Sequence, residues 1–141
     1  MSRQLATFVL GGAHYGVDVL LVQEALRSQD RTPVPLAPSG VAGLVNLRGE
    51  VVLSIDLRHR LGLAPLAEDA EPMMVVVQVD GEPISLLVDE VGDVIDVAES
   101  QFETPPDTLD PALRELIVGA YKLPTSLLMA LDVQKATAQA A

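Results

Sequence analysis

The chain has 141 residues, of which 49% are hydrophobic and only 3% aromatic. A chain of this length forms one domain that buries roughly two thirds of the surface its unfolded form exposes. Nine basic and twenty acidic residues give a net charge of −11, which opposes non-specific binding to nucleic acid or anionic lipid. Cysteine is absent, and no apolar run approaches the roughly 20 residues of a membrane-spanning helix. We therefore expect a cytoplasmic protein with no nucleic-acid partner and no membrane insertion.

The first part of the chain has the pattern of a hairpin followed by an irregular segment. Apolar residues recur with a period of two or in short runs between Gly, Pro and Asp, which is typical of strands. A strand over residues 5–10 is expected to lead through a turn at residues 11–14 to a second strand over residues 15–22. Three prolines follow, and Ser39 is expected to cap one helical turn over residues 40–44.

The middle of the chain is predicted to form strands. The strand over residues 50–57 alternates so that one face is expected to point into the core, namely Val51, Leu53, Ile55 and Leu57. Residues 73–79 and 84–88 are predicted to pair across Asp80-Gly81, a dipeptide that suits the positive φ angles of a tight hairpin. Pro83 cannot donate a ladder hydrogen bond, so we expect it at a sheet edge.

The last third contains a bent strand, two helices and a hairpin. Gly92 is predicted to form a bulge in a strand over residues 88–97. Asp110 and Pro111 signal the start of a short helix. After a hairpin of residues 117–121 and 126–131, Asp132 is expected to cap a terminal helix. Many short strands with closely spaced turns predict a small barrel or paired barrels.

A search for catalytic chemistry finds no motif. His14 and His59 have no paired-histidine spacing, and Ser54 does not lie in a nucleophile elbow, so all three are expected to have surface or packing roles. Carboxylate pairs such as Asp89-Glu90 are expected on a solvated face. We therefore expect no catalytic, cofactor-binding or metal-binding residues.

The most informative segment is residues 45–58, Val-Asn-Leu-Arg-Gly-Glu-Val-Val-Leu-Ser-Ile-Asp-Leu-Arg. Here an Arg-Gly pair opens an apolar strand that closes on Asp-Leu-Arg. The chain also carries Tyr-Gly-Val-Asp-Val at residues 15–19 and Leu-Asp-Val at residues 131–133. In this order the three segments resemble the CheW family of chemotaxis coupling proteins. The resemblance covers residues 5–135 as one CheW-like domain, and it leaves residues 1–4 and 136–141 as flexible termini.

The resemblance implies a mostly β fold with two SH3-like five-stranded barrels that share a hydrophobic core, and short helices that include a C-terminal one. It implies a non-enzymatic adaptor that couples chemoreceptors, the methyl-accepting chemotaxis proteins, to a CheA-type histidine kinase. Such a protein is cytoplasmic, is recruited to chemoreceptor arrays and has no cofactor. Its partners are the cytoplasmic tip of the receptor and the regulatory domain of the kinase.

The resemblance also implies a receptor-binding surface. Its residues are Val22, Glu24, Arg48 and Gly49. The planar guanidinium of Arg48 suits a carboxylate or carbonyl pair, and Glu24 is the expected local partner. For the strand over residues 88–97 core packing is the default interpretation, with a secondary interface at Val91 and Val94 as the alternative. The kinase-binding face is not assigned to residues.

Two departures from the family pattern limit the comparison. Leu53 stands where the family usually has proline, and residues 122–125, Lys-Leu-Pro-Thr, replace the more common Asp/Gly-rich turn. Within the family, the chain can also be a coupler of a non-motility chemosensory pathway or a paralogue that binds only the receptor. From another class, a small-ligand binder or an enzyme that uses the cleft between the barrels stays as an alternative.

Overall fold

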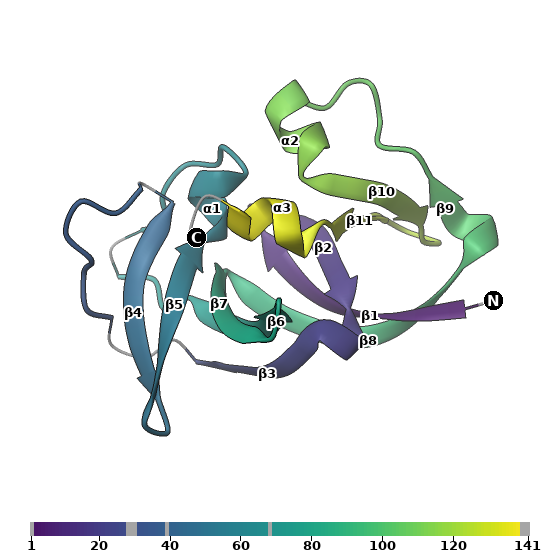
Figure 1. Cartoon of the computed structure of the whole chain (residues 1–141). Helices are drawn as coiled ribbons and strands as arrows, with labels where there is room; N and C mark the ends of the chain where they lie inside the picture. The colour runs from purple at the N-terminus through teal and green to yellow at the C-terminus, as the bar shows by residue number, and fades with distance from the viewer. Residues whose placement is uncertain (1, 28–30, 39, 68, 139–141) are drawn as a thin grey trace.

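The computed structural model describes residues 2–27, 31–38, 40–67 and 69–138. Two antiparallel-rich β-sheets lie side by side, and short helices cover their boundary and one end (Figure 1). The six-stranded sheet has the order β8-β1-β2-β11-β10-β9 and consists of β1 (Ser2–Leu10), β2 (Ala13–Asp18), β8 (Glu90–Ala98), β9 (Phe102–Glu103), β10 (Ile117–Lys122) and β11 (Leu127–Leu131). The five-stranded sheet has the order β3-β6-β7-β5-β4 and consists of β3 (Val22–Arg27), β4 (Val41–Leu47), β5 (Glu50–Asp56), β6 (Met73–Val79) and β7 (Glu82–Val88).

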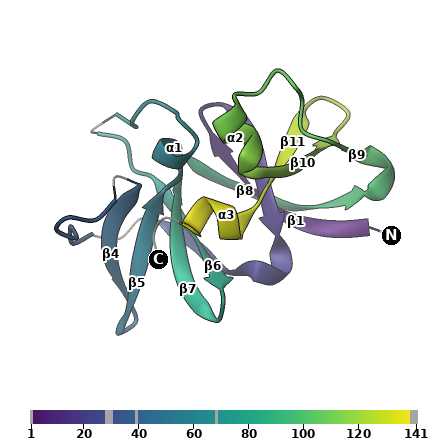
Figure 2. The ribbon, with the colours of Figure 1, turned by 45° about the horizontal axis from the view of Figure 1, so that its top comes forward.

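The helices are all short. They are η1 (Val19–Leu21), α1 (Leu57–Arg60), η2 (Glu99–Gln101), α2 (Pro111–Glu115) and α3 (Val133–Thr137). Figure 2 shows α3 at the boundary of the two sheets, with α1 beside it. None of the helices in the described residues is long and apolar enough to cross a membrane.

The apolar side chains form three clusters, and the largest lies between the sheets. This shared core takes residues from both sheets, among them Phe8, Val17, Ile55, Leu86 and Leu131. A second cluster lies inside the six-stranded sheet and contains Leu5, Val97, Tyr121, Leu128 and Ala130. A third lies inside the five-stranded sheet and contains Val45, Val52, Met74, Val76 and Leu87. The mostly β fold of two barrel-like halves around a shared core is confirmed, with a sixth strand in one sheet where five were predicted.

Three hairpins have two-residue turns with nearly the same backbone. The φ angles are 59° and 81° at Gly11-Gly12, 55° and 88° at Arg48-Gly49, and 52° and 83° at Asp80-Gly81. Positive φ at both turn residues is typical of the type I′ turn, which matches the twist of the flanking strands. The turn predicted at Asp80-Gly81 is confirmed, and the predicted turn of residues 11–14 is shorter because β2 begins at Ala13.

Two predictions in the first half of the chain are wrong. The strand predicted over residues 15–22 ends at Asp18, whose carboxylate accepts a hydrogen bond from the Leu20 backbone N–H and caps η1. The helical turn predicted over residues 40–44 is part of β4, which pairs with β5. Ser39, its predicted cap, lies outside the described residues. The prolines and Gly43 suggested a break, but the hairpin partner β5 holds this segment extended.

The predicted core face of β5 is also partly wrong. Val51 is 63% exposed, whereas Val52 and Ser54 on the opposite face are buried. Val51 lies at the exposed start of the strand, and from Val52 onward the strand lies between the shared core and the interior of the five-stranded barrel, so both faces are covered there. Pro83 is not on an edge strand, because β7 pairs on both sides. It precedes Ile84, where the pairing with β5 begins, so its missing N–H interrupts no ladder.

Other local predictions are confirmed. β8 has one extra residue at Gly92-Asp93 relative to β1, which is the predicted bulge. Asp110 and Asp132 accept hydrogen bonds from backbone N–H groups at the starts of α2 and α3. Ordered elements extend past residues 5–135, since β1 begins at Ser2 and α3 ends at Thr137.

The two departures from the family pattern lie in β5, at Leu53, and in the last hairpin, at residues 122–125. Leu53 lies on an inner strand, opposite Leu44 on one side and Ile84 on the other, so it alters no sheet edge. In the last hairpin, the Leu123 backbone N–H donates to the Ser126 carbonyl at 2.9 Å.

Candidate functional site

Arg48 stands at the tip of the β4–β5 hairpin and forms a forked ion pair with Glu24. Its Nη1 and Nη2 atoms lie 2.9 and 3.0 Å from the two carboxylate oxygens of Glu24. The Arg48 side chain is 80% exposed and that of Glu24 is 20% exposed. The predicted pairing of these two residues is confirmed.

The turn beneath Arg48 is well supported. Asn46 Oδ1 accepts a hydrogen bond from the Gly49 backbone N–H at 2.9 Å. No atom lies within 4 Å of the position that a Cβ of Gly49 would take, so this backbone is open to a partner. Gly49 has φ = 88°, a conformation that glycine adopts without strain.

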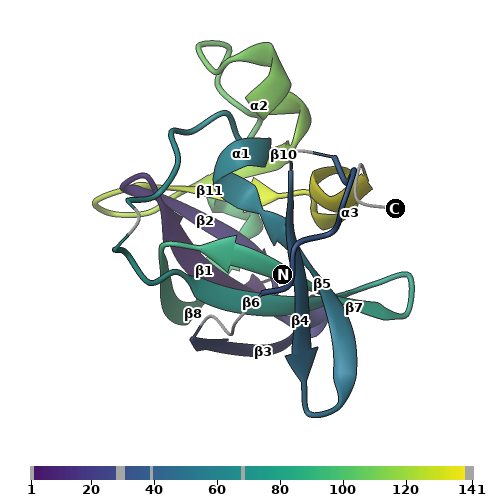
Figure 3. The same cartoon turned by 90° about the vertical axis from the view of Figure 1, so that its left-hand side faces the viewer.

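The ion pair also joins the two edges of the five-stranded sheet. Glu24 lies on edge strand β3 and Arg48 follows edge strand β4. Further along, Thr32, in the segment that follows β3, exchanges two backbone hydrogen bonds of 2.8 Å with Leu44 on β4. The sheet is therefore closed into a barrel at two points, one formed by the backbone and one by the Arg48 and Glu24 side chains. Figure 3 shows β3 and β4 approaching each other at the lower end of the molecule.

A register shift in β3 gives Val22 and Glu24 different surroundings. Val22 pairs with Val77, which belongs to the shared core, and Glu24 pairs with Val76, which belongs to the barrel interior. Direct partners in an antiparallel pair point to the same face. Val22 is therefore half-buried against the shared core, while Glu24 reaches Arg48 from the mouth of the barrel.

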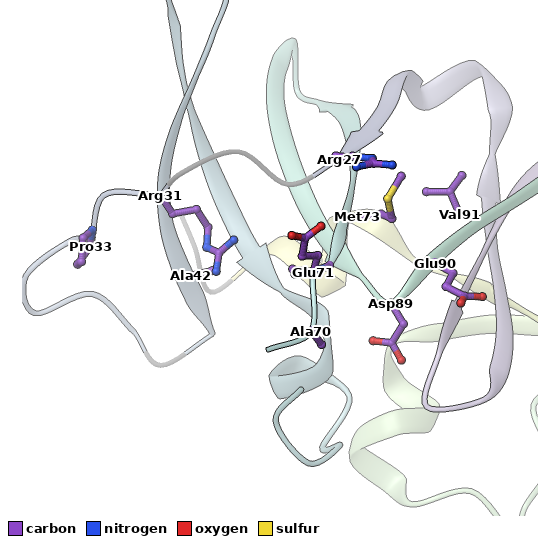
Figure 4. A pocket seen from close by; sticks show the side chains of 11 residues that line it. Arg27, Arg31, Pro33, Ala42, Ala70, Glu71, Met73, Asp89, Glu90 and Val91 are labelled. Atoms are coloured by element: carbon purple, nitrogen blue, oxygen red, sulfur yellow. The ribbon is translucent and has the colours of Figure 1, made fainter. Parts of the chain in front are cut away.

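Val91 and Val94 lie on β8, the edge strand of the other sheet. Val94 is 51% exposed, and Val91 packs partly against the shared core. Figures 1 and 3 both show β8 close to β3. Beside them lies a hollow of about 960 Å³ that extends from Glu90 and Val91 on β8 past Arg27 and Met73 to Ala42 on β4 (Figure 4). The six predicted site residues thus lie at three sheet edges, β3, the tip of β4 and β8, and the ion pair joins the first two.

A second forked ion pair, which no sequence motif predicts, joins Arg58 and Asp89. Arg58 Nε and Nη2 each lie 2.7 Å from a carboxylate oxygen of Asp89. The side chains are only 18% and 17% exposed. Asp89 also accepts a hydrogen bond from the Gly11 backbone N–H at 2.9 Å. The prediction that Asp89 belongs to a solvated acidic face is therefore wrong.

The pKa values of this pair shift as the geometry requires. The hydrogen bonds from Arg58 hold the pKa of the Asp89 carboxyl below its ordinary value of 3.8, and the Gly11 N–H acts in the same direction against the effect of burial. The hydrogen bond with Asp89 also raises the pKa of the Arg58 guanidinium. Both groups therefore stay charged at neutral pH.

No catalytic constellation is found among these side chains. His14 lies in β2 and His59 in α1, and both are exposed. In the part of the chain that the structure describes, no three His, Cys, Asp or Glu side chains are grouped as a metal site would require. Ser54 is buried inside the five-stranded barrel beside Ser85.

Comparisons with known proteins agree with this geometry. The family model "CheW-like domain" matches residues 4–141. The "Chemotaxis protein CheW" of Treponema pallidum is 35% identical over 136 residues, which cover 94% of this chain and 80% of that protein. That of Rhizobium meliloti is 30% identical over 122 residues, 86% of this chain and 79% of that protein.

A solved structure is similar over nearly the whole fold. The scaffolding protein TtCheW from Thermoanaerobacter tengcongensis has a TM-score of 0.82 and 28% sequence identity, and the match covers 94% of this chain and 90% of that one. The chain therefore belongs to the CheW-like family and is a non-enzymatic chemotaxis coupling protein of the scaffold type.

Proposed function

We propose that this protein joins the cytoplasmic tip of a chemoreceptor to the regulatory domain of a CheA-type histidine kinase. The receptor-binding surface consists of Val22, Glu24, Arg48 and Gly49, with Val91 and Val94 on the facing edge. Binding there recruits the protein to receptor arrays in the cytoplasm. The protein contacts the receptor on one surface and the kinase on another. A movement of the receptor tip changes the first contact, and the change reaches the kinase through the second.

The observation that carries the proposal is the residue at the first position of the β4–β5 turn. The other two turns of the same φ angles have glycine and aspartate there, residues that adopt positive φ easily. Arg48 has φ = 55°, a backbone conformation that is unfavourable for arginine. Its guanidinium forms one exposed ion pair, with Glu24. An exposed pair contributes about 0 to 1 kcal/mol, so folding alone does not explain an arginine at this turn. A partner whose carboxylate or carbonyl groups bind the N–H donors of a guanidinium would explain the arginine.

The surroundings of Arg48 fit a helical partner. Val22 on β3 and Val91 on β8 are apolar positions at the margins of the shared core, and Val94 is exposed on the same strand as Val91. The hollow beside these strands gives room for side chains of a rod laid along the boundary of the two sheets. A helical hairpin in this position would contact both edges at once and would place carbonyl or carboxylate groups beside Arg48.

The test is titration calorimetry with a purified cytoplasmic fragment of a methyl-accepting chemotaxis protein from the same organism. Wild-type protein should bind the fragment. Arg48→Glu removes the fork and places a second acid beside Glu24, and a central charged contact typically costs about 2 kcal/mol or more. Since about 1.4 kcal/mol is a tenfold change, affinity should fall at least about tenfold.

A second titration uses the isolated regulatory domain of the kinase. Arg48→Glu should bind this domain like the wild type, which shows that the variant is folded. If wild-type protein binds the receptor fragment but gives no heat with the kinase domain, the receptor-only paralogue is the better description. If Arg48→Glu unfolds while each folded molecule keeps its receptor affinity, Arg48 is structural and the surface is wrongly assigned.

A further inference from the structure

The chain passes between the two sheets at two points, and one of them is Asp89. The first crossing is η1, which connects β2 to β3, and the second is the single residue between β7 and β8. The Asp89 backbone N–H donates to the Val9 carbonyl at 3.0 Å, and its carboxylate accepts from Gly11 at 2.9 Å. Asp89 is therefore fixed to β1 and to the β1–β2 turn, both in the six-stranded sheet.

Arg58 ties this crossing to the five-stranded sheet. It lies in α1, directly after β5, and forks onto Asp89. Its remaining nitrogen, Nη1, donates to the Ala64 carbonyl at 2.6 Å. The guanidinium thus joins the end of β5, the following loop and the start of β8 in one set of hydrogen bonds.

Arg60, two residues later, makes the matching contact on the other side of α1. Its Nε donates to the Ala136 carbonyl at 2.8 Å and its Nη2 to the Lys135 carbonyl at 2.9 Å. These carbonyls belong to the last turn of α3, which follows β11 of the six-stranded sheet. Carbonyls at the C-terminus of a helix favour a cation, and the Lys135 carbonyl accepts from Arg60 in addition to the Ala138 backbone N–H. One short helix therefore contacts the six-stranded half of the molecule at two separate places.

We propose that Arg58 and Arg60 are positioning residues that set the angle between the two sheets and so the spacing of β3 and β8. This inference rests on the proposed function, because it matters for signalling only if the receptor lies across these edges. β8 begins directly after Asp89, so Val91 and Val94 follow any movement of the crossing. The arginines act on the receptor surface from outside it, since neither lines the hollow beside β3 and β8.

The test measures the distance between a label on each sheet, which changes with the angle between the sheets, and it needs no partner protein. The chain has no cysteine, so spin labels can be attached at Val51→Cys in the five-stranded sheet and Val118→Cys in the six-stranded sheet. Both positions are exposed. In Arg58→Lys, which keeps the charge but loses the fork, the electron-spin distance distribution between the labels should broaden and shift. Arg60→Lys is a second, independent variant for the case that Arg58→Lys does not fold.

Arg114→Lys is the matched control, because Arg114 forms an exposed ion pair with Asp107 at 3.4 Å in the region of α2. It should leave the distribution unchanged. Without the labels, Arg58→Lys should bind the receptor fragment about fivefold more weakly, within the range of coupling by residues that do not touch a ligand. The affinity of Arg58→Lys for the kinase regulatory domain is the folding control: an unchanged affinity means that the variant is folded and only its receptor surface is altered.

The outcomes separate the two ideas. A distribution in Arg58→Lys and Arg60→Lys as narrow as in wild type overturns the positioning role, whatever the receptor does. A broadened distribution with undiminished receptor affinity overturns the link between the angle and binding. Absence of receptor binding by wild-type protein refutes the proposed function, while the distances still decide whether the arginines set the angle.

Discussion

The two forked ion pairs of this protein have similar bond lengths and different surroundings. Arg48 and Glu24 meet at a hairpin tip, where the guanidinium is 80% exposed and has one carboxylate partner. Arg58 and Asp89 are each less than one fifth exposed and bind two further backbone groups. An exposed pair is screened by solvent, while a withdrawn pair leaves an uncompensated charge when one partner is removed. The same chemistry therefore stabilises the fold at one site and leaves a donor group accessible at the other.

The largest expected effect is the loss of stability on removing the Asp89 charge. Asp89→Asn weakens the bonds to Arg58 and leaves this guanidinium partly buried without a counter-charge. We expect a loss of about 2 kcal/mol in the free energy of unfolding, measured by urea denaturation. Glu24→Gln, the equivalent change at the exposed pair, should lose less than about 1 kcal/mol. Equal losses at the two sites would abolish the distinction.

Acid should reproduce part of this loss. The pKa of Asp89 is lower in the folded protein than its ordinary value of 3.8. The stabilisation is therefore complete above that pH and is lost as the pH falls from 3.8 through the folded value. Urea midpoints measured at pH 6 and at successive steps below pH 4 should decrease less in Asp89→Asn than in wild type. A parallel decrease in both proteins would assign acid sensitivity to other carboxylates.

A smaller effect is expected from the turn that carries Arg48. Gly49→Ala puts a Cβ on a residue with φ = 88°, where no neighbouring atom would obstruct it. Only backbone strain remains, which is about 1 kcal/mol. Thermal unfolding should show this loss, with Gly62→Ala at φ = 76° and equally open surroundings as the control. No loss at Gly49 would mean that the turn relaxes and does not hold Arg48 rigidly.

The smallest effect on stability is expected from Arg48→Asn. Asparagine suits the first position of a type I′ turn, so the loss of the exposed ion pair should be nearly balanced by relief at positive φ. We expect a change within about 0.5 kcal/mol in the free energy of unfolding, together with weaker receptor binding. A large destabilisation would place Arg48 in the same class as Arg58.

The sequence predicts the exposed pair better than the withdrawn one for a physical reason. Arg48 precedes an apolar strand in a motif that the family resemblance makes recognisable, and the same resemblance assigns Glu24 to the receptor-binding surface beside it. Asp89 and Arg58 are 31 positions apart, and their contact depends on where β7 crosses to β8. The Asp-Leu-Arg at the end of the predicted strand draws attention to Arg58. The periodicity of the sequence does not identify the carboxylate that pairs with it.

The errors in the fold prediction share a cause. Alternation identifies a core face only when the other face meets water, and β5 is covered on both sides. Val52 and Ser54 therefore looked like outward residues although they fill the barrel interior. The segment after the prolines has no strong strand pattern of its own, and its extended form depends on pairing with β5. Tertiary contacts decided both cases.

The order of the strands along the chain has a consequence for synthesis on the ribosome. All strands of the five-stranded sheet lie between Val22 and Val88, whereas the six-stranded sheet needs β1 and β2 from the beginning and β11 from near residue 131. At about 5 to 20 residues per second, β11 is completed roughly 2 to 9 s after β7. During that interval the core around Val75, Val77 and Leu86 lacks the part of its cover that Ile117, Met129 and Leu131 supply. The nascent chain is then at its greatest risk of aggregation, and a chaperone that shields these apolar side chains would act in that interval.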